Sequence, residues 1–442
     1  MASYRSMWWA IGLASACLAS SDTPGSIKHE LSNWDDVDQM IDDFKNVTRM
    51  AFSAGDRSGR KHSYAKGKMT MSKRVAMASS SKFPVVLALA KAIADGHVSF
   101  DTKVSDVFSW WTGDTLDIRS RVTLKHLMSF TSGMVINSVG SGNISCLGLR
   151  GIFYSSEGCA RQIYNEAPFE AEPGTTWSYH SLHLQVAAAM VAKATGLSLQ
   201  SFLKEFALKP LGMQRSFWIG AANPHVAATL VSCGDDYDSL LRKYLAYEAV
   251  PKEIADILEA DWTAPPVQPS RLEKDKMLLN VFGHYSMGLY FECVANITSS
   301  DASGDALETN VGLRWRPECA AQKRHSDPGA FGYWPLIDRS KDFYMQLVAM
   351  FVEPYQKGMS IDTWASLPAR AIAPLRFSLQ QPVERALGKS SEDDKGDGGS
   401  LAHGIDMMFQ FAKLESELGP LLSPAELKLV EASIGFSDAF SE

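Results

Sequence analysis

The stretch of sequence that most constrains the fold is a helix with almost no polar face. Residues 83–96 read FPVVLALAKAIADG. Pro84 is tolerated in the first turn of a helix, and Gly96 is a residue type that commonly ends one. A helix that is apolar nearly all round is stable only when other elements enclose it. We therefore expect this helix to lie in the middle of the protein.

Strand patterns occur on both sides of this helix, and helical patterns fill the region between them. Residues 35–52 predict a helix, and turns over 55–59 and 67–68 separate the first strands. Later strands are expected over 285–294, 329–338 and 343–351, with a final helix over 361–387. The order predicts a mixed α/β fold, in which an antiparallel sheet flanked by helices carries an inserted, mostly helical region.

Polar residues mark where helices of the inserted region begin. Thr123 and Ser198 are typical N-cap residues, and Gly196 ends an Ala-rich helix expected over 182–195. The helix that follows Ser198 is expected to stop before Pro210.

The N-terminus predicts export. The apolar stretch over residues 7–19 is shorter than the roughly 20 residues that a membrane-spanning helix needs. It predicts a signal peptide over residues 1–20, cleaved after Ala16 or Ala19, and a lipoprotein signal that exposes Cys17 is the alternative. No other uninterrupted apolar run approaches membrane length, so we expect a protein that is secreted or lumenal in the secretory pathway, without stable membrane insertion.

Cysteine usage agrees with export. Two close pairs suit disulfides in an oxidising compartment, and Cys233 is left as a buried thiol. These pairs are Cys146 with Cys159, and Cys293 with Cys319. Glycosylation sequons begin at Asn46, Asn143 and Asn296 and favour a eukaryotic secretory route.

Charge and motif content exclude several classes of function. The chain has 43 basic and 50 acidic side chains and a net charge of −7, which argues against nucleic acid as a partner. The H-E-x-x-H, C-x-x-C and G-x-S-x-G motifs and a complete phosphate-binding loop are absent. His180 and His183 lack a third ligand or nearby carboxylate, so we interpret them as core or surface histidines. No metal or cofactor is expected.

The remaining chemical motif is Ser-x-x-Lys, whose spacing places a hydroxyl and an amine on one helix face. The copies in this chain are Ser58/Lys61, Ser63/Lys66, Ser79/Lys82 and Ser201/Lys204. In the turn or strand surroundings of the first two copies, the paired side chains are expected to point apart. Only Ser79 begins the buried helix, where free N–H groups and the helix dipole favour developing negative charge, and where burial favours a neutral Lys82. An ordinary helix cap beside a snorkelling lysine is the alternative.

Five segments in a fixed order carry a family resemblance. They read ASSSKFP (78–84), VTLKHLMSFTSG (122–133), PGTTWSYHS (173–181), ATGLSLQSFLKEFALKPLGM (194–213) and GAFGYWPLIDR (329–339). The order and spacing resemble the serine β-lactamase-related family, which includes class C β-lactamases, D-amino-acid-releasing peptidases and β-lactamase-like esterases. The resemblance implies a β-lactamase/transpeptidase-like fold.

The resemblance also implies how the chain is divided. It covers one catalytic domain over residues 35–388. The α/β parts are expected over 35–100 and 280–388, the helical insert over 101–279, a linker over 389–400 and a helical tail over 401–442.

Roles follow from the resemblance residue by residue. Ser79 would be the acylated nucleophile, and Lys82 would help to take its proton. Tyr179 would act as a phenolate or proton shuttle that returns the proton to the leaving group, provided that positive neighbours stabilise the phenolate. The Ser79 amide and an amide near Gly329 would hold the oxyanion.

Two departures from the family pattern affect the expected substrate. Ser181 stands where the family has asparagine, and it cannot offer both an amide donor and an amide acceptor. His325 could fill the cationic position of the third motif, but Asp327 follows it, and a carboxylate there would repel a substrate carboxylate. Ser181, His325 and Gly329 are the candidate substrate-binding residues.

These observations predict a secreted, metal-independent serine hydrolase that forms an acyl-enzyme on Ser79. An esterase or peptidase acting on a small-molecule or peptide substrate fits better than a β-lactamase, because a substrate without a carboxylate avoids the repulsion. A true β-lactamase, or an inactive family member that serves as a binding protein, are the alternatives.

Overall fold

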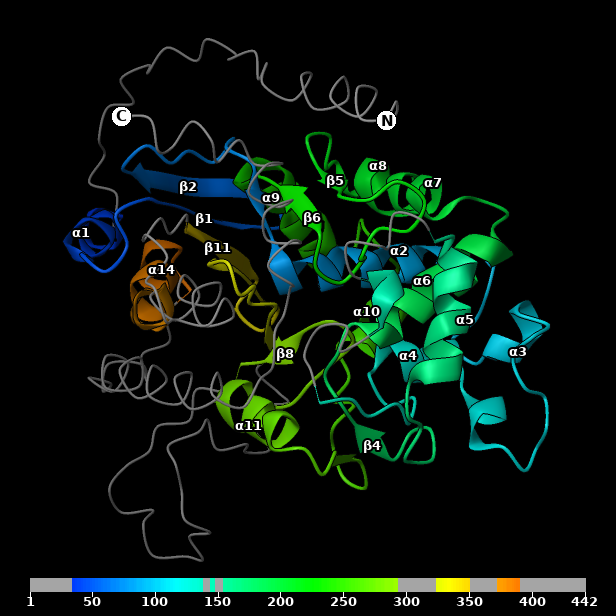
Figure 1. Cartoon of the computed structure of the whole chain (residues 1–442). Coiled ribbons are helices and arrows are strands. Elements are labelled where there is room, and N and C mark those ends of the chain that lie inside the picture. The colour runs from blue at the N-terminus through cyan, green and yellow to red at the C-terminus, as the bar shows by residue number, and fades with distance from the viewer. Residues whose placement is uncertain (1–33, 138–143, 148–153, 293–322, 350–371, 390–442) are drawn as a thin grey trace, which may run out of the picture.

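The computed structural model describes residues 34–137, 144–147, 154–292, 323–349 and 372–389 (Figure 1). The predicted signal peptide, the predicted tail and all of the predicted linker except Lys389 lie outside the described residues, as do Cys293 and Cys319.

A six-stranded antiparallel sheet combines strands from both ends of the chain. The strand order is β2-β1-β11-β10-β9-β8, and each neighbouring pair for which a register is given is antiparallel. In β1, Met50 lies opposite Lys66 of β2 and Ala349 of β11. The strands are β1 Met50–Asp56, β2 Gly59–Lys66, β8 Tyr290–Phe291, β9 Arg324–Ser326, β10 Tyr333–Asp338 and β11 Phe343–Ala349. The mixed α/β fold with an antiparallel sheet is confirmed.

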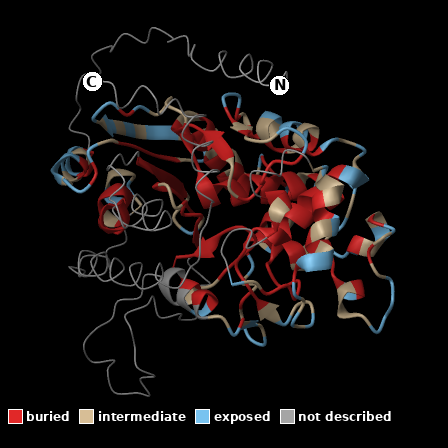
Figure 2. Cartoon of the chain, viewed as in Figure 1, coloured by how far each residue is buried: buried red, intermediate tan, exposed pale blue. Residues whose placement is uncertain are grey.

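The apolar helix α2, Lys82–Ala94, lies in the middle of the molecule as expected. Every residue of α2 is buried except Lys91, Ile93 and Ala94. Figure 1 shows α2 beside α6, Leu182–Ala194, with α4, α5 and α7 gathered around them, and Figure 2 shows buried residues concentrated along α2 and α6. The helical cluster is therefore built around α2, and the 3₁₀ turn Ala78–Ser81 that leads into α2 contacts β10 of the sheet.

Other elements complete the layers around this core. Helix α9 packs on β1, β10 and β11, whereas α1 contacts β2 and α14. The remaining helices are α1 Asp35–Asp43, α3 Val104–Val107, α4 Leu124–Met128, α5 Ser156–Glu166, α7 Leu199–Leu203, α8 Lys209–Leu211, α9 Gly234–Leu245, α10 Lys252–Leu258, α11 Glu273–Phe282 and α14 Gln380–Ala386. The short strands β3 Val75–Ala76, β5 Phe217–Trp218 and β6 Leu230–Ser232 form a second sheet, and β4 Thr176–Trp177 pairs with β7 Gln268–Pro269.

The expected helix over 35–52 is wrong in its second half. Helix α1 ends at Asp43, and β1 begins at Met50. The first six residues of β1 are buried, and β1 pairs with strands on both sides. This pairing outweighs the local helical spacing of the apolar residues.

The helix after Ser198 does not stop before Pro210. It continues through a π-helical turn, Lys204–Leu208, into α8, and it ends at Gly212 with φ of 76°. A π turn widens the backbone next to a proline that has no N–H to donate, so it accommodates Pro210 within the helix.

Other sequence predictions have mixed outcomes. Thr123 and Ser198 accept hydrogen bonds from the backbone N–H groups of His126 and Ser201, so both predicted caps are confirmed.

The strand expected over 285–294 is limited, among the described residues, to β8 and a bridge between Tyr285 and Tyr290. Strand β9 was not predicted. It lies between β8 and β10 and brings residues 324–329 toward α2.

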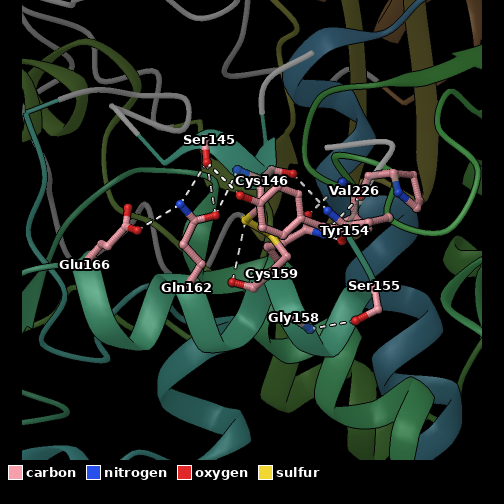
Figure 3. The surroundings of a disulfide bond; sticks show 12 residues. Ser145, Cys146, Tyr154, Ser155, Gly158, Cys159, Gln162, Glu166 and Val226 are labelled. Atoms are coloured by element: carbon pink, nitrogen blue, oxygen red, sulfur yellow. Dashed lines mark hydrogen bonds between the residues drawn. A yellow bond between two sulfur atoms is a disulfide. The ribbon is translucent and has the colours of Figure 1, made fainter. Parts of the chain in front are cut away.

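The predicted disulfide between Cys146 and Cys159 is present, with a Cα–Cα distance of 5.3 Å (Figure 3). Cys233 is buried and free. The carbonyl of Cys146 accepts a hydrogen bond from Asn223 Nδ2 at 2.9 Å. Asn223 Oδ1 in turn accepts from Gln185 Nε2 on α6 at 2.8 Å. The disulfide is therefore tied to α6 and to the loop after β5.

Within the described residues, no helix by itself is long and apolar enough to cross a membrane. Helix α6 together with Leu199–Leu211 meets that criterion only as a pair bent by 92°.

Replacing a core leucine of α2 should destabilise the whole fold. Leu89 is 0% exposed, so Leu89→Ala leaves a cavity and is expected to lower the free energy of unfolding by about 2–5 kcal/mol. Leu116, which is 90% exposed, provides the matched control, and Leu116→Ala should change the free energy by less than about 0.5 kcal/mol. Urea unfolding followed by tryptophan fluorescence measures both, and equal effects would contradict the central position of α2.

Candidate active site

The Ser79 side chain and the Lys82 side chain meet at the start of α2. A 3₁₀ turn, Ala78–Ser81, leads directly into the helix, so the hydroxyl and the amine lie on the same side of the chain. Lys82 Nζ donates to Ser79 Oγ at 2.9 Å, and the two residues are 1% and 8% exposed. Ala78 has φ of 47°, a strained left-handed conformation of the kind that occurs at functional sites.

Lys82 has the properties of a base. Burial lowers the pKa of its amine to about 8, although the negative charge of Asp327 acts in the opposite direction. Its second acceptor is the carbonyl oxygen of Ala227, at 3.2 Å. A substantial fraction of Lys82 is therefore neutral near physiological pH and able to accept a proton from Ser79.

Tyr179 completes the group as a neutral phenol. Lys82 Nζ lies 4.8 Å from the centroid of the Tyr179 ring. Burial and the nearby charge of Asp327 raise the pKa of Tyr179 far above its usual range, although hydrogen bonds with Ser79 and Tyr290 oppose this shift. The resting site therefore does not stabilise a phenolate, and the Tyr179 hydroxyl is suited to donate a proton rather than to act first as a base.

Aromatic rings enclose Tyr179. Their ring centroids lie between 5.6 and 6.1 Å from that of Tyr179. The rings belong to Phe130, Trp177, Tyr285 and Tyr290. This enclosure restricts solvent around the phenol and strengthens the electrostatic interactions within the group.

Asp327, which follows β9, is the carboxylate that borders Lys82. Its Oδ2 accepts a hydrogen bond from the Phe83 N–H at 3.2 Å, and its carbonyl oxygen accepts from Ser80 Oγ. The residue is 1% exposed, and burial raises the pKa of its carboxyl well above the usual range, against the lowering effect of Lys82. Asp327 therefore fastens β9 to the first turn of α2.

Gly329 lies against the turn that carries Ser79. A Cβ atom at this position would come within 2.1 Å of the Met77 carbonyl oxygen and 2.9 Å of Ser80 Oγ, so only glycine fits. Its own N–H donates to the Tyr333 carbonyl at 2.8 Å. The Gly329 N–H is therefore already paired, so the oxyanion donor expected near Gly329 would have to be another amide, and Ala330 is the next residue along the chain.

The described contacts do not join the other two candidate binding residues, His325 and Ser181, to the group that contains Ser79 and Lys82. The ring of His325 lies 4.3 Å from that of Phe291, and burial lowers the pKa of His325, with Glu259 and Arg339 as the nearby charges. Ser181 is buried at the start of α6, where its carbonyl accepts from the Gln185 N–H. Asp327, rather than His325, therefore holds the position beside Lys82.

Sequence reasoning missed further buried polar residues near the group. Both ring nitrogens of His225 lack a hydrogen-bond partner among the described residues, and burial together with the charge of Lys82 lowers its pKa to about 3. Lys274 and Asp275 contact the backbone of Tyr179. These two residues stand in the charged run EKDK, which is typical of a solvent-exposed helix, so the sequence carries no signal for their burial.

The other candidate motifs behave as ordinary structure. Contrary to expectation, Lys61 Nζ reaches Ser58 Oγ at 2.8 Å, but this pair is exposed in the β1–β2 turn. His180 and His183 are buried and stacked, with ring centroids 3.9 Å apart, as core histidines. Within the described part of the chain, no group of three His, Cys, Asp or Glu side chains could hold a metal ion.

Comparisons with known proteins bear on the family and on the fold. Residues 37–250 match the family model for β-lactamases. Esterase EstB from Burkholderia gladioli is 30% identical over 154 residues, which cover 33% of this chain and 38% of the esterase. The chain thus spans about two fifths of the length of the curated relative that it matches.

Solved structures show the same fold at low sequence identity. A candidate β-lactamase from Bacteroides dorei has a TM-score of 0.57 at 20% identity, covering 78% of this chain and 99% of its own. A β-lactamase/D-alanine carboxypeptidase from Yersinia pestis has a TM-score of 0.53 at 14% identity, covering 79% of this chain and 98% of its own. Ser79, Lys82 and Tyr179 thus lie together inside a β-lactamase-like fold, within the part of the chain, residues 37–250, that matches the β-lactamase family.

Proposed function

We propose that this protein is a serine hydrolase that forms an acyl-enzyme on Ser79 and acts as an esterase or amidase. The observation that carries the proposal is the buried hydrogen bond of 2.9 Å between Lys82 Nζ and Ser79 Oγ, beside the neutral Tyr179. The match of residues 37–250 to the β-lactamase family and the 30% identity to an esterase over 154 residues support the same chemistry.

The geometry supports a defined sequence of proton transfers. Neutral Lys82 accepts the Ser79 proton as Oγ forms a bond to the substrate carbonyl carbon, and backbone N–H groups of Ser79 and the strand after Gly329 bind the oxyanion. Tyr179 then donates its proton to the leaving alcohol or amine and regains one from the Lys82 ammonium. A water molecule then attacks the acyl carbon and gives its proton to Tyr179 as Tyr179 passes one to Lys82. Lys82 returns a proton to Ser79 Oγ as the bond between Oγ and the acyl carbon breaks, and the acid is released.

Asp327 favours substrates that carry no carboxylate on the leaving group. The position next to Lys82 holds a carboxyl group, which offers no cation to a substrate carboxylate in either protonation state and repels it when ionised. β-Lactams and peptides that end in D-alanine carry such a carboxylate. An uncharged ester or amide is therefore the proposed substrate class.

Export to an oxidising compartment is a separate proposal. The disulfide between Cys146 and Cys159, together with the apolar stretch over residues 7–19, supports it. Asn46, at the start of one glycosylation sequon, is exposed as such a site requires.

A fluorophosphonate probe should label Ser79. Labelling and the hydrolysis of p-nitrophenyl butyrate are both expected to fall by at least about 10³-fold in Ser79→Ala. Ser58→Ala is the matched control, because Ser58 also accepts a hydrogen bond from the lysine three residues on but is exposed, and it should keep wild-type activity. Peptide mass spectrometry identifies the labelled residue. An unlabelled Ser79 in folded protein would favour the inactive binding protein instead.

Substrate charge should affect the rate through Asp327. Methyl 4-acetoxybenzoate and 4-acetoxybenzoate share one acetyl group and differ in the charge of the leaving group. We expect wild-type kcat/KM to favour the neutral ester by at least about tenfold, and Asp327→Asn to reduce that preference. Nitrocefin, which carries a carboxylate, should be a poor substrate. A preference for the charged ester would contradict the proposed substrate class.

The pH profile should report the Lys82 amine. Because the neutral amine is the base, kcat/KM is expected to rise with pH through a midpoint near the Lys82 pKa of about 8. Asp327 raises that pKa, so Asp327→Asn should move the midpoint to lower pH. Asp36→Asn, at an exposed position of α1, serves as the control and should leave the profile in place. An unchanged profile in Asp327→Asn would show that its charge does not act on the base.

A further inference from the structure

A fully buried ion pair lies directly behind Tyr179. Lys274 and Asp275 lie in the first turn of helix α11, and their side chains are both 0% exposed. Lys274 Nζ lies 2.5 Å from Asp275 Oδ1. Burying two charges costs free energy that their mutual attraction recovers only when further hydrogen bonds satisfy them. The partners of this pair therefore indicate what holds it in place.

Those partners are mainly the main chain of Tyr179 and its neighbours. Asp275 Oδ1 accepts from the Tyr179 N–H at 2.9 Å, and Lys274 Nζ donates to the Tyr179 carbonyl at 3.0 Å. The pair thus binds both polar groups of one residue. Asp275 Oδ2 accepts from Ser178 Oγ at 2.8 Å and from Ser270 Oγ at 2.5 Å.

The approach of this segment to Tyr179 is set before α11 begins. Strand β7 runs parallel to β4, with Trp177 opposite Pro269, and the Ser270 N–H donates to the Trp177 carbonyl at 2.8 Å. The chain from β7 into α11 therefore runs alongside the residues that lead to Tyr179. On the other side of Tyr179, the Lys82 amine lies 4.8 Å from its ring.

We propose that Lys274 and Asp275 are positioning residues for Tyr179, holding its main chain so that its hydroxyl stays at Ser79. The proposal rests on the proposed function, because it assigns to Tyr179 the transfer of a proton to the leaving group. A displacement of about 1 Å in such a group can cost about 10²-fold in rate. The position of Tyr179, rather than the affinity for substrate, is what the pair controls.

The test compares Asp275→Asn in the wild-type and Tyr179→Phe backgrounds with p-nitrophenyl butyrate. In the wild-type background we expect kcat to fall by about 10–100-fold with KM changed less than about threefold. In Tyr179→Phe the same substitution should cost less than about twofold, because no hydroxyl is left to position. Equal losses in both backgrounds, or a loss confined to KM, would overturn the proposal.

A matched control separates positioning from loss of stability. Asp338→Asn removes a carboxylate of β10 that is also 0% exposed and paired with a cation at 2.8 Å, namely Arg324, which in turn contacts Glu384 of α14. It should lower the free energy of unfolding and leave kcat per folded molecule within about twofold of wild type. Circular dichroism gives the folded fraction. A comparable loss of kcat in Asp338→Asn would also overturn the proposal.

A milder variant covers the case in which Asp275→Asn does not fold. Ser270→Ala removes one hydrogen bond to Asp275 without touching Tyr179, and it should lower kcat by about 2–10-fold in the wild-type background only. The failure of the proposed function has a different signature, since wild-type protein would then hydrolyse the ester no faster than Ser79→Ala. If wild type exceeds Ser79→Ala but Asp275→Asn and Ser270→Ala keep full kcat, the positioning role alone is wrong.

Discussion

Burial of the Lys82 amine is the constraint on which the rest of the site depends. An enclosed ammonium is costly, so its pKa falls to about 8 and its donors are directed to Ser79 Oγ and the Ala227 carbonyl. The enclosure comes from α2 itself, which is stable only inside the protein because it has no polar face. The helix that organises the core is therefore also the helix whose first turn can hold a neutral amine beside a hydroxyl.

Distant parts of the helical region are connected to the segment that carries the Ala227 carbonyl, one of the two acceptors of the Lys82 amine. The Val226 N–H donates to Gln185 Oε1 at 3.1 Å, and Gln185 also binds Asn223, which reaches the carbonyl of Cys146. Ala227 follows Val226 directly. Hydrogen bonds thus connect the disulfide, helix α6 and the loop after β5 to the residue before Ala227, whose carbonyl oxygen is the second acceptor of the Lys82 amine.

Local patterns predicted α2, its Ser-x-x-Lys motif and the caps at Thr123 and Ser198, because these features depend on neighbours in sequence. Features that depend on pairing between distant segments were missed. The helical spacing before Met50 gave way to two-sided strand pairing in β1, and β9 is too short to show a periodicity. In the same way, Lys274 and Asp275 have the charge pattern of a surface helix in the sequence. Only the structure shows that both are buried and bind the main chain of Tyr179.

Asp327 shows how a departure from a family motif can change both structure and chemistry. The resemblance implies a cation at His325 that would attract a substrate carboxylate, but the residue beside Lys82 is Asp327, whose carboxyl accepts a hydrogen bond from the Phe83 N–H at the start of α2. It also gives the buried Lys82 a countercharge, so the site is close to neutral whether the proton lies on the amine or on the carboxyl. A cation at this position would repel Lys82 and lower its pKa further. Asp327 therefore anchors the helix and balances the charge of the base instead of attracting an acidic substrate, which agrees with the uncharged ester or amide proposed as substrate.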